Sequence, residues 1–267
     1  MAATMLSFII RFYRALFARR IFYRLNKVLY YCSLRGLGIL NFENDRISGE
    51  ERFIKRLLAG KTGGVVFDVG ANVGNYSSKV LQTNRLLTVY AFEPHPRTFA
   101  TLEKNVQHSN FTPINAAAGE SAGMADLYDY AADDGSSHAS LYQDVIESIH
   151  RAPSTHHQVK VVALGEFAQA NQITNITLLK IDTEGNELNA LKGIEDFLST
   201  GKVEAIHFEF NEMNIASRVF FRDFLDLLPN YDFYRLLPDG MVKLEKYSPV
   251  FCEIFAYQNI VALLKRS

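Results

Sequence analysis

The segment from Phe67 to Ser77 constrains the fold of this chain more than any other stretch. It passes from an apolar run, Val65 to Val69, through a glycine-containing turn into a predicted helix. Gly70 and Gly74 permit a tight turn beside a ligand, and Asn72 is the non-glycine residue best suited to a left-handed backbone. A helix that begins there directs its free N–H groups at the turn. The segment therefore predicts a strand–turn–helix unit with a ligand site at its turn.

An acidic residue, Glu93, closes the next predicted strand, residues 87 to 92. In parallel α/β sheets a carboxylate at this position accepts hydrogen bonds from the hydroxyl groups of a ribose. Together with the glycine turn, Glu93 predicts a nucleoside-containing cofactor.

The composition of the turn distinguishes between two such cofactors. A dinucleotide site requires Gly-x-Gly-x-x-Gly, but the second and third glycine positions are occupied by Asn72 and Asn75. Asp68, inside the loop, would repel a pyrophosphate and would suit the sulfonium and amino groups of S-adenosylmethionine. The loop therefore favours S-adenosylmethionine over NAD. A turn that only packs a strand on a helix is the alternative, which Glu93 disfavours.

Three ordered blocks of sequence resemble the hallmark motifs of the FkbM-type methyltransferases: residues 66–77, 91–96 and 179–193. The resemblance covers about residues 48–264. It implies a class I methyltransferase fold, S-adenosylmethionine as methyl donor, and O-methylation of sugars, glycans or polyketide-type products. The sequence differs from the usual family motif at Thr183 and Asn186. Both residues flank the acceptor side, so the resemblance does not identify the acceptor.

Alternating strand and helix patterns predict an α/β fold with a doubly wound, mostly parallel, Rossmann-like sheet of seven strands. The predicted strands are residues 65–69, 87–92, 112–117, 176–182 and 203–210, with closing strands in 231–237, 241–246 and 251–264. The predicted helices are residues 75–83, 96–107, 186–199 and 215–228, preceded by one that a capping box at Ser48–Glu51 would start. We expect residues 1–44 to form a basic helical arm with a linker from Ser33, and residues 45–267 to form the methyltransferase domain.

The strand ends supply the candidate site residues. For the cofactor we expect contacts from Asp68, Gly70, Ala71, Asn72, Gly74, Glu93, Pro94, Asn115 and Ala117, with the adenine packing near the last two.

For catalysis, Asp182 and Glu209 end two further strands and could hold the acceptor or accept its proton. Lys180 shares a strand face with Asp182 and could tune its charge. His207 is either an orienting partner for Glu209 or a buried histidine with satisfied hydrogen bonds. Glu187 fits a structural role at a helix N-terminus. No ligand spacing compels a metal, so none is expected.

The polar stretch from Tyr130 to His157 is long for a connection, which makes it either a lid over the substrate or a surface insertion. An extra strand is predicted after it, at residues 159–164. His95 and His138 are expected in exposed loops, and His138 is the better candidate for a role because it lies in this stretch.

The net charge of −1 conceals an uneven distribution. Residues 1–42 carry seven basic and no acidic residues, so the remainder carries −8, and only the arm suits an anionic surface. No nucleic-acid partner is expected. Cys32 and Cys252 lie too far apart to indicate a disulfide framework, which favours a reduced, cytoplasmic setting.

The arm carries two apolar stripes, from Leu6 to Phe17 and from Ile21 to Leu29, that are out of phase by roughly 135°. This predicts either two helices broken near Ala18 to Arg20 or one helix with two different faces. The arm could pack on the domain, pair with a second copy in a homo-oligomer, or attach residues 6–29 to an anionic membrane, on its inner face.

The function that these features predict is methyl transfer from S-adenosylmethionine to a hydroxyl of a sugar, glycan, glycolipid or related small molecule. Methylation of nitrogen or of a carboxylate is an alternative. So are an NAD-dependent oxidoreductase, which the loop disfavours, and a membrane-recruited binding protein without turnover.

Overall fold

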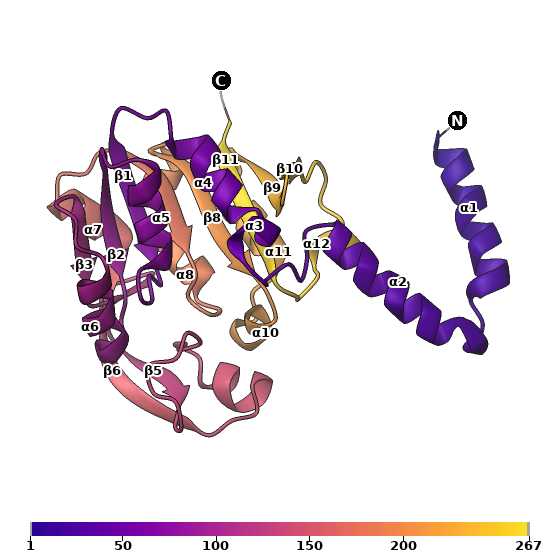
Figure 1. The fold of residues 1–267 in the computed structure, drawn as a ribbon, viewed down its shortest axis with the longest axis horizontal. Helices are drawn as coiled ribbons and strands as arrows, with labels where there is room; N and C mark the ends of the chain where they lie inside the picture. The colour runs from indigo at the N-terminus through magenta and orange to yellow at the C-terminus, as the bar shows by residue number, and fades with distance from the viewer. Residues whose placement is uncertain (1, 266–267) are drawn as a thin grey trace.

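The computed structural model describes residues 2–265, which are built around an eight-stranded sheet (Figure 1). The strand order is β10-β9-β11-β8-β7-β1-β2-β3. The strands are β1 (Gly64–Val69), β2 (Leu87–Phe92), β3 (Phe111–Ile114), β7 (Ile176–Ile181), β8 (Val203–Phe210), β9 (Tyr231–Leu237), β10 (Gly240–Lys243) and β11 (Gln258–Leu264). The neighbouring strands β3, β2, β1, β7 and β8 pair in parallel, whereas β11, β9 and β10 pair antiparallel. The predicted α/β, mostly parallel architecture is confirmed. The predicted count of seven strands is wrong: the sheet has eight, and β10 lies where a closing strand was expected at residues 241–246.

Helices cover both faces of this sheet, as a doubly wound fold requires. They are α4 (Glu50–Leu58), α5 (Asn75–Thr83), α6 (Pro96–Asn105), α7 (Leu164–Ala170), α8 (Glu187–Lys192), α9 (Glu195–Ser199), α11 (Phe221–Leu227) and α12 (Pro249–Cys252), whereas α10 (Met213–Ser217) lies beyond the strand ends and packs on residues 145 and 146. Val66 packs with α4 and α5 in one core, whereas its neighbour Phe67 packs with α8 and α11 in the other. The alternation of side chains along buried strands therefore supplies both cores.

Three local predictions differ from the structure. The helices predicted at 186–199 and 215–228 are each broken into two. The capping box is wrong, because Ser48 ends α3 (Asp45–Ser48) and α4 begins after Gly49, whose φ is +89°. The strand predicted at 112–117 ends at Ile114, since the Asn115 amide turns back to the carbonyl oxygens of Glu93 and Pro94.

A second, three-stranded sheet has the order β4-β6-β5. Its strands are β4 (Ala117–Gly119), β5 (Gly123–Tyr130) and β6 (Ser154–Ala163), and a short π-helix, Val145–Ile149, lies between β5 and β6. The extra strand predicted at residues 159–164 is present but starts earlier, at Ser154. The polar stretch Tyr130 to His157 is therefore anchored in this sheet at both ends.

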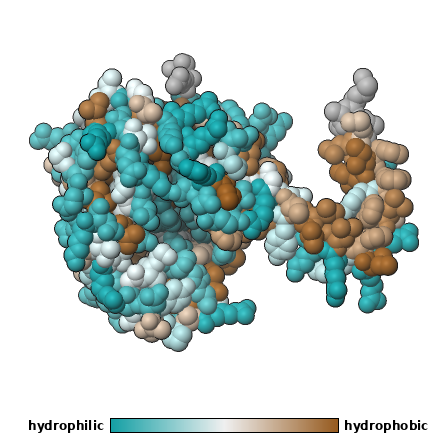
Figure 2. All heavy atoms as spheres, viewed as in Figure 1, coloured by the Kyte–Doolittle hydropathy of each residue, from teal (hydrophilic) through white to brown (hydrophobic). Residues whose placement is uncertain are grey.

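The arm consists of α1 (Ala2–Phe17), a 3-10 turn (Arg20–Phe22) and α2 (Tyr23–Gly36), so the two-helix alternative is confirmed. Because α2 continues to Gly36, the predicted linker begins later than Ser33. The arm projects from the domain, and its apolar side chains gather on the surface (Figures 1 and 2). Its root is fixed by a bridge between Ile39 and Gln258 of β11. Within residues 2–265 no helix is long and apolar enough to cross a membrane.

Candidate functional site

A cavity of about 390 Å³ opens where β1, β2, β7 and β8 end. Gly70, Glu93, Asp182 and Glu209 each contribute to its wall from one of these strand ends. The segment 136–139, between β5 and β6, forms another wall. A cavity of this size at the carboxyl ends of parallel strands is the usual ligand site of an open α/β sheet.

The glycine turn has the backbone that its sequence predicts. The φ angles of Gly70, Asn72 and Gly74 are +77°, +48° and +90°, so the predicted left-handed Asn72 is confirmed. A Cβ atom at Gly70 would overlap the carbonyl oxygen of Asp182. Only glycine lets the end of β1 approach the end of β7 this closely, and this contact shapes the cavity floor.

Glu93 is buried at the cavity wall and is held by two backbone amides. Its Oε2 accepts from Asn72 N at 2.9 Å, and its Oε1 accepts from His95 N at 2.8 Å. Burial raises the pKa of Glu93 to about 7, against the opposing effect of these hydrogen bonds. Because each carboxylate oxygen has two acceptor positions, both oxygens can still accept from ligand hydroxyl groups.

Asp68 is fully buried at the end of β1 and does not line the cavity, so its predicted contact with the cofactor stays a prediction. Its Oδ2 accepts from Ser77 Oγ at 2.6 Å, and its Oδ1 has no hydrogen-bond partner among the described residues. Burial raises the pKa of Asp68, and the positive charge of Lys180 opposes this shift. Any effect of Asp68 on a ligand in the cavity would therefore act through the turn or through its charge.

The predicted cofactor residues divide into two groups. Those that line the cavity are Gly70, Asn72, Glu93, Pro94 and Ala117. Those outside its wall are Asp68, Ala71, Gly74 and Asn115. Ala71 donates its N–H to the carbonyl oxygen of Phe92, and the exposed Asn115 donates to the carbonyl oxygen of Glu93. Both residues therefore help to hold the end of β2 and the loop that carries Glu93 in place. Ala116 and Ala118 also line the cavity, which leaves room for a flat ring.

The other end of the cavity is acidic. Its wall includes Asp182, Glu184, Glu209 and Glu212. The predicted pair of Lys180 and Asp182 is confirmed, with Nζ 2.7 Å from Oδ2. Burial alone would lower the pKa of Lys180, but Asp182 and Asp68 outweigh it and raise that pKa. Lys180 therefore stays charged beside Asp182.

Two of these carboxyl groups are shifted toward the neutral form. Withdrawal from solvent, with Asp182 nearby, raises the pKa of Glu209 well above its ordinary value. Burial also raises the pKa of Glu184 to about 7. His138 Nδ1 lies 3.3 Å from Glu184 Oε1, and this hydrogen bond raises the pKa of His138. Groups poised in this way are suited to proton transfer at neutral pH.

His207 and Glu187 have structural roles. His207 is fully buried between Tyr76 Oη, at 3.1 Å, and Asn259 Oδ1, at 2.9 Å, and burial lowers its pKa to about 3. The alternative of a satisfied core histidine is therefore confirmed. Glu187 accepts from the backbone N–H groups of Thr183 and Gly185, so it supports the turn after β7.

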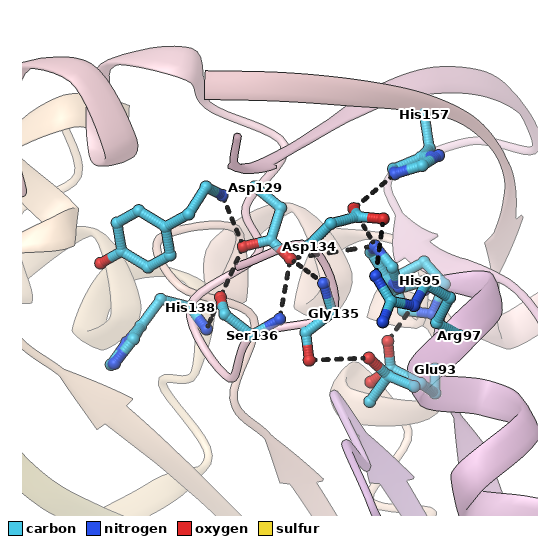
Figure 3. A network of polar contacts seen from close by, with 12 residues as sticks. Glu93, His95, Arg97, Asp129, Asp134, Gly135, Ser136, His138 and His157 are labelled. Carbon is cyan, nitrogen blue, oxygen red and sulfur yellow. Dashed lines mark hydrogen bonds and ion pairs between the residues drawn. The ribbon is translucent and has the colours of Figure 1, made fainter. Parts of the chain in front are cut away.

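The wall formed by residues 136–139 is fixed by a polar network (Figure 3). Asp129 Oδ2 accepts from the N–H groups of Gly135 at 2.8 Å and Ser136 at 2.9 Å. His95 is fully buried in this network, so the prediction of an exposed loop for it is wrong. The reason is non-local: the second sheet brings Asp134 and His157 over the imidazole ring.

Several wall residues were not predicted. Phe42, from the segment after the arm, and Tyr257, before β11, lie at the cavity with their rings 6.0 Å apart. Glu212 also lines it. No local motif marks these three residues, because they reach the cavity from elements distant in sequence. Glu184, in contrast, lies within the block 179–193 that the resemblance singled out.

Comparison with known proteins gives one family. The family model described as the methyltransferase FkbM domain matches residues 68–234. The 31-O-demethyl-FK506 methyltransferase FkbM of Streptomyces tacrolimicus is 31% identical over 159 residues, which cover 51% of this chain and 61% of that protein. The hexuronic acid methyltransferase AglP of Haloferax volcanii is 27% identical over 158 residues, which cover 58% of this chain and 60% of that protein. The chain thus matches about three fifths of the length of each relative. Among solved structures, the plantazolicin methyltransferase BpumL in complex with SAH is similar with a TM-score of 0.44 and 10% identity, covering 95% of this chain and 93% of that one.

Proposed function

Because the chain belongs to the FkbM methyltransferase family, we propose that it transfers a methyl group from S-adenosylmethionine to a hydroxyl oxygen of a sugar, glycan, glycolipid or related small molecule. The observation that carries this proposal is a single cavity with two unlike ends. One end holds the glycine turn and Glu93, and the other holds four carboxyl groups.

The first end fits the methyl donor. The carboxylate of Glu93 would accept hydrogen bonds from the ribose hydroxyls, and the small side chains of Ala116 and Ala117 would face the adenine. The left-handed turn at Gly70 and Asn72 would contact the rest of the donor. When bound there, S-adenosylmethionine supplies an electrophilic methyl group on its sulfonium.

The second end fits the acceptor. Asp182, which is paired with Lys180, would orient the acceptor hydroxyl, and Glu209 is the second candidate for this contact. With the donor bound, the acceptor oxygen would receive the methyl group while the carbon–sulfur bond breaks with its electrons on sulfur, and whichever of Asp182 and Glu209 is ionised would take the hydroxyl proton. Carboxylates also hydrogen-bond the remaining hydroxyls of a sugar. The names of the two relatives, a 31-O-demethyl-FK506 methyltransferase and a hexuronic acid methyltransferase, support transfer to an oxygen and a sugar-like acceptor.

Calorimetry and product analysis test the proposal. We expect the protein to bind S-adenosylhomocysteine and not NADH, and to methylate a saccharide hydroxyl with S-adenosylmethionine. Asp182→Asn and Glu209→Gln should reduce turnover and leave S-adenosylhomocysteine affinity nearly unchanged. Binding of NADH alone would favour the oxidoreductase. Transfer to an amine or carboxylate, undiminished in both variants, would favour the other methylation chemistries. Binding of the donor without turnover on any acceptor class would favour the binding protein.

We also propose that the arm attaches the enzyme to an anionic membrane, which would make it a peripheral protein of a cytoplasmic membrane face. Apolar side chains on both helices are exposed, among them Leu6, Ile9 and Phe12 on α1 and Leu25 and Val28 on α2. The seven basic residues of the arm and its root complement anionic lipid headgroups. Residues 1–44 would then serve attachment, and residues 45–267 would form the catalytic domain.

A matched pair of variants tests the arm. Ile9→Asp places a charge on the apolar stripe of α1, whereas Ser7→Asp places the same charge on the side that carries Arg11 and Arg14. We expect Ile9→Asp to abolish cosedimentation with anionic vesicles and Ser7→Asp to retain most of it. If both bind alike, the membrane proposal fails. If Ile9→Asp instead converts a dimer to a monomer in light scattering, the stripe serves a second copy of the chain.

A further inference from the structure

Two histidines and one aspartate converge where the second sheet meets the loop after β2 (Figure 3). His95 Nε2 lies 2.9 Å from Asp134 Oδ1, and His157 Nε2 lies 2.7 Å from the same oxygen. The three ligand atoms lie within 4.8 Å of one another. The methyl transfer proposed above uses none of these side chains.

The three residues come from separate elements, and each is held in place by other contacts. His95 precedes α6 and donates its backbone N–H to Glu93. Asp134 lies in the turn whose next two N–H groups are bound by Asp129. His157 lies within β6, paired with β5. Contacts made by the rest of the fold therefore position these three residues, independently of the interactions among their side chains.

The donor set matches a divalent transition metal. Two imidazole nitrogens and one carboxylate oxygen are ligands that Zn²⁺ binds at about 2.0–2.2 Å, with a fourth position left for water. Both rings approach the same oxygen, while Arg97 Nη1 lies 3.4 Å from the other oxygen, Oδ2. Asp129 Oδ2, 3.8 Å from His95 Nε2, brings a second negative charge to the position. Two carboxylates balance the charge of one divalent ion.

The Asp134 carboxylate is within hydrogen-bonding distance of both rings through one oxygen, at 2.9 Å from His95 Nε2 and 2.7 Å from His157 Nε2. An ion bound at this position would replace these two contacts.

We propose that His95, Asp134 and His157 bind one divalent transition-metal ion, with Zn²⁺ the best match to this donor set. The ion would fasten the turn that carries Gly135 and Ser136 to the loop that carries Glu93. It would thus be a structural clamp that holds the 136–139 wall against the end of the cavity assigned to the donor.

Titration of the chelator-treated full-length protein with Zn²⁺ tests this inference. We expect one ion to bind per chain with a rise in melting temperature. Removing a direct ligand in His157→Gln should weaken binding by at least ~10-fold, since even the loss of a group that supports a ligand costs about that much. His156→Gln is the matched control, because His156 is the exposed neighbour on the same strand. Co²⁺ should give the visible absorption of a four-coordinate site in the wild type and in His156→Gln only.

Asp134→Asn provides a second variant, because an amide oxygen can still accept a hydrogen bond but is a poor zinc ligand. The metal-free melting temperature shows whether each variant is folded. Equal Zn²⁺ affinity in the wild type, His157→Gln and Asp134→Asn would overturn the inference. So would a wild-type protein whose melting temperature does not respond to Zn²⁺ or Co²⁺. In either case the cluster is a hydrogen-bonded tie between the two sheets and nothing more. Binding of S-adenosylhomocysteine is a separate measurement, so this outcome leaves the proposed function intact.

Discussion

The buried carboxyl group of Glu93 makes donor binding depend on pH in a way that one substitution removes. Burial raises its pKa from 4.5 to about 7, so the ionised form is disfavoured by roughly 3 kcal/mol in the folded protein. Because this is an acid with a raised pKa, the contribution of the neutral form to stability is complete below about pH 4.5. It is lost as the pH rises to about 7.

Ribose hydroxyls donate hydrogen bonds, so they favour the ionised carboxylate and binding lowers the pKa of Glu93. The affinity for S-adenosylhomocysteine should therefore increase as the pH rises through about 7 and then level off. Each hydrogen bond to a charged acceptor contributes about 1.5–3 kcal/mol, which corresponds to roughly 10- to 150-fold in affinity. In Glu93→Gln the side chain has only one acceptor oxygen, and its NH₂ group must face the N–H of Asn72 or of His95.

Calorimetry with S-adenosylhomocysteine at several pH values on both sides of 7 measures this effect. We expect Glu93→Gln to bind at least ~10-fold more weakly and to lose the dependence on pH. Glu184→Gln is the control, because burial also raises the pKa of Glu184 to about 7 but its side chain lies at the acceptor end. The reasoning is refuted if Glu93→Gln keeps the wild-type affinity, or if the pH dependence disappears in Glu184→Gln and persists in Glu93→Gln.

Three further substitutions probe the site. Gly70→Ala should lower the free energy of unfolding, measured by urea titration, by more than ~2 kcal/mol, because φ is +77° and the added Cβ would overlap Asp182. Gly123→Ala is the control and should be nearly neutral, because no atom lies near the position of its Cβ. Lys180→Met should destabilise the protein by roughly 3 kcal/mol at neutral pH, since it leaves Asp68 and Asp182 without their cation. If the loss of stability in Lys180→Met is as large in acid as at neutral pH, this reasoning is contradicted. Tyr76→Phe should cost about 1 kcal/mol of stability by removing the hydrogen bond to His207 and should leave S-adenosylhomocysteine binding unchanged in calorimetry.

The sequence predicted those parts of the site that depend on neighbouring residues. The left-handed backbone at Asn72 follows from its place in a glycine turn between a strand and a helix. The Lys180–Asp182 pair follows from the alternation of side chains along a strand. Both are properties of a few consecutive residues, so no knowledge of the remaining fold was needed.

The parts that were not predicted depend on contacts between distant segments. Asp68 adjoins the glycine turn in sequence, yet its carboxylate accepts a hydrogen bond from Ser77 and the residue does not line the cavity. His95 looked like a loop residue, but strands from the second sheet cover it. Ser48 had the spacing of a helix cap, but Gly49 took that position because its backbone lies against the Leu237 carbonyl, where no Cβ fits. For His95 and Gly49 the deciding contact comes from a segment distant in sequence, whereas for Asp68 it comes from Ser77, nine positions away in the following helix.

The acidic end of the cavity favours a neutral hydroxyl over a carboxylate as the reacting group. Asp182, Glu184, Glu209 and Glu212 share this wall, and the buried cation Lys180 beside it already pairs with Asp182. An additional carboxylate about 4 Å from an ionised carboxylate of this wall would be repelled by roughly 4 kcal/mol at the effective dielectric constant of ~20 that suits such sites. The raised pKa of Glu209, due to its withdrawal from solvent and to Asp182, reports that the wall already resists more negative charge. A hydroxyl group meets no such barrier and can donate its proton to the carboxylate that holds it. Among the methylation chemistries that the sequence leaves open, the electrostatics of this wall therefore count against carboxyl methylation and in favour of transfer to a hydroxyl oxygen.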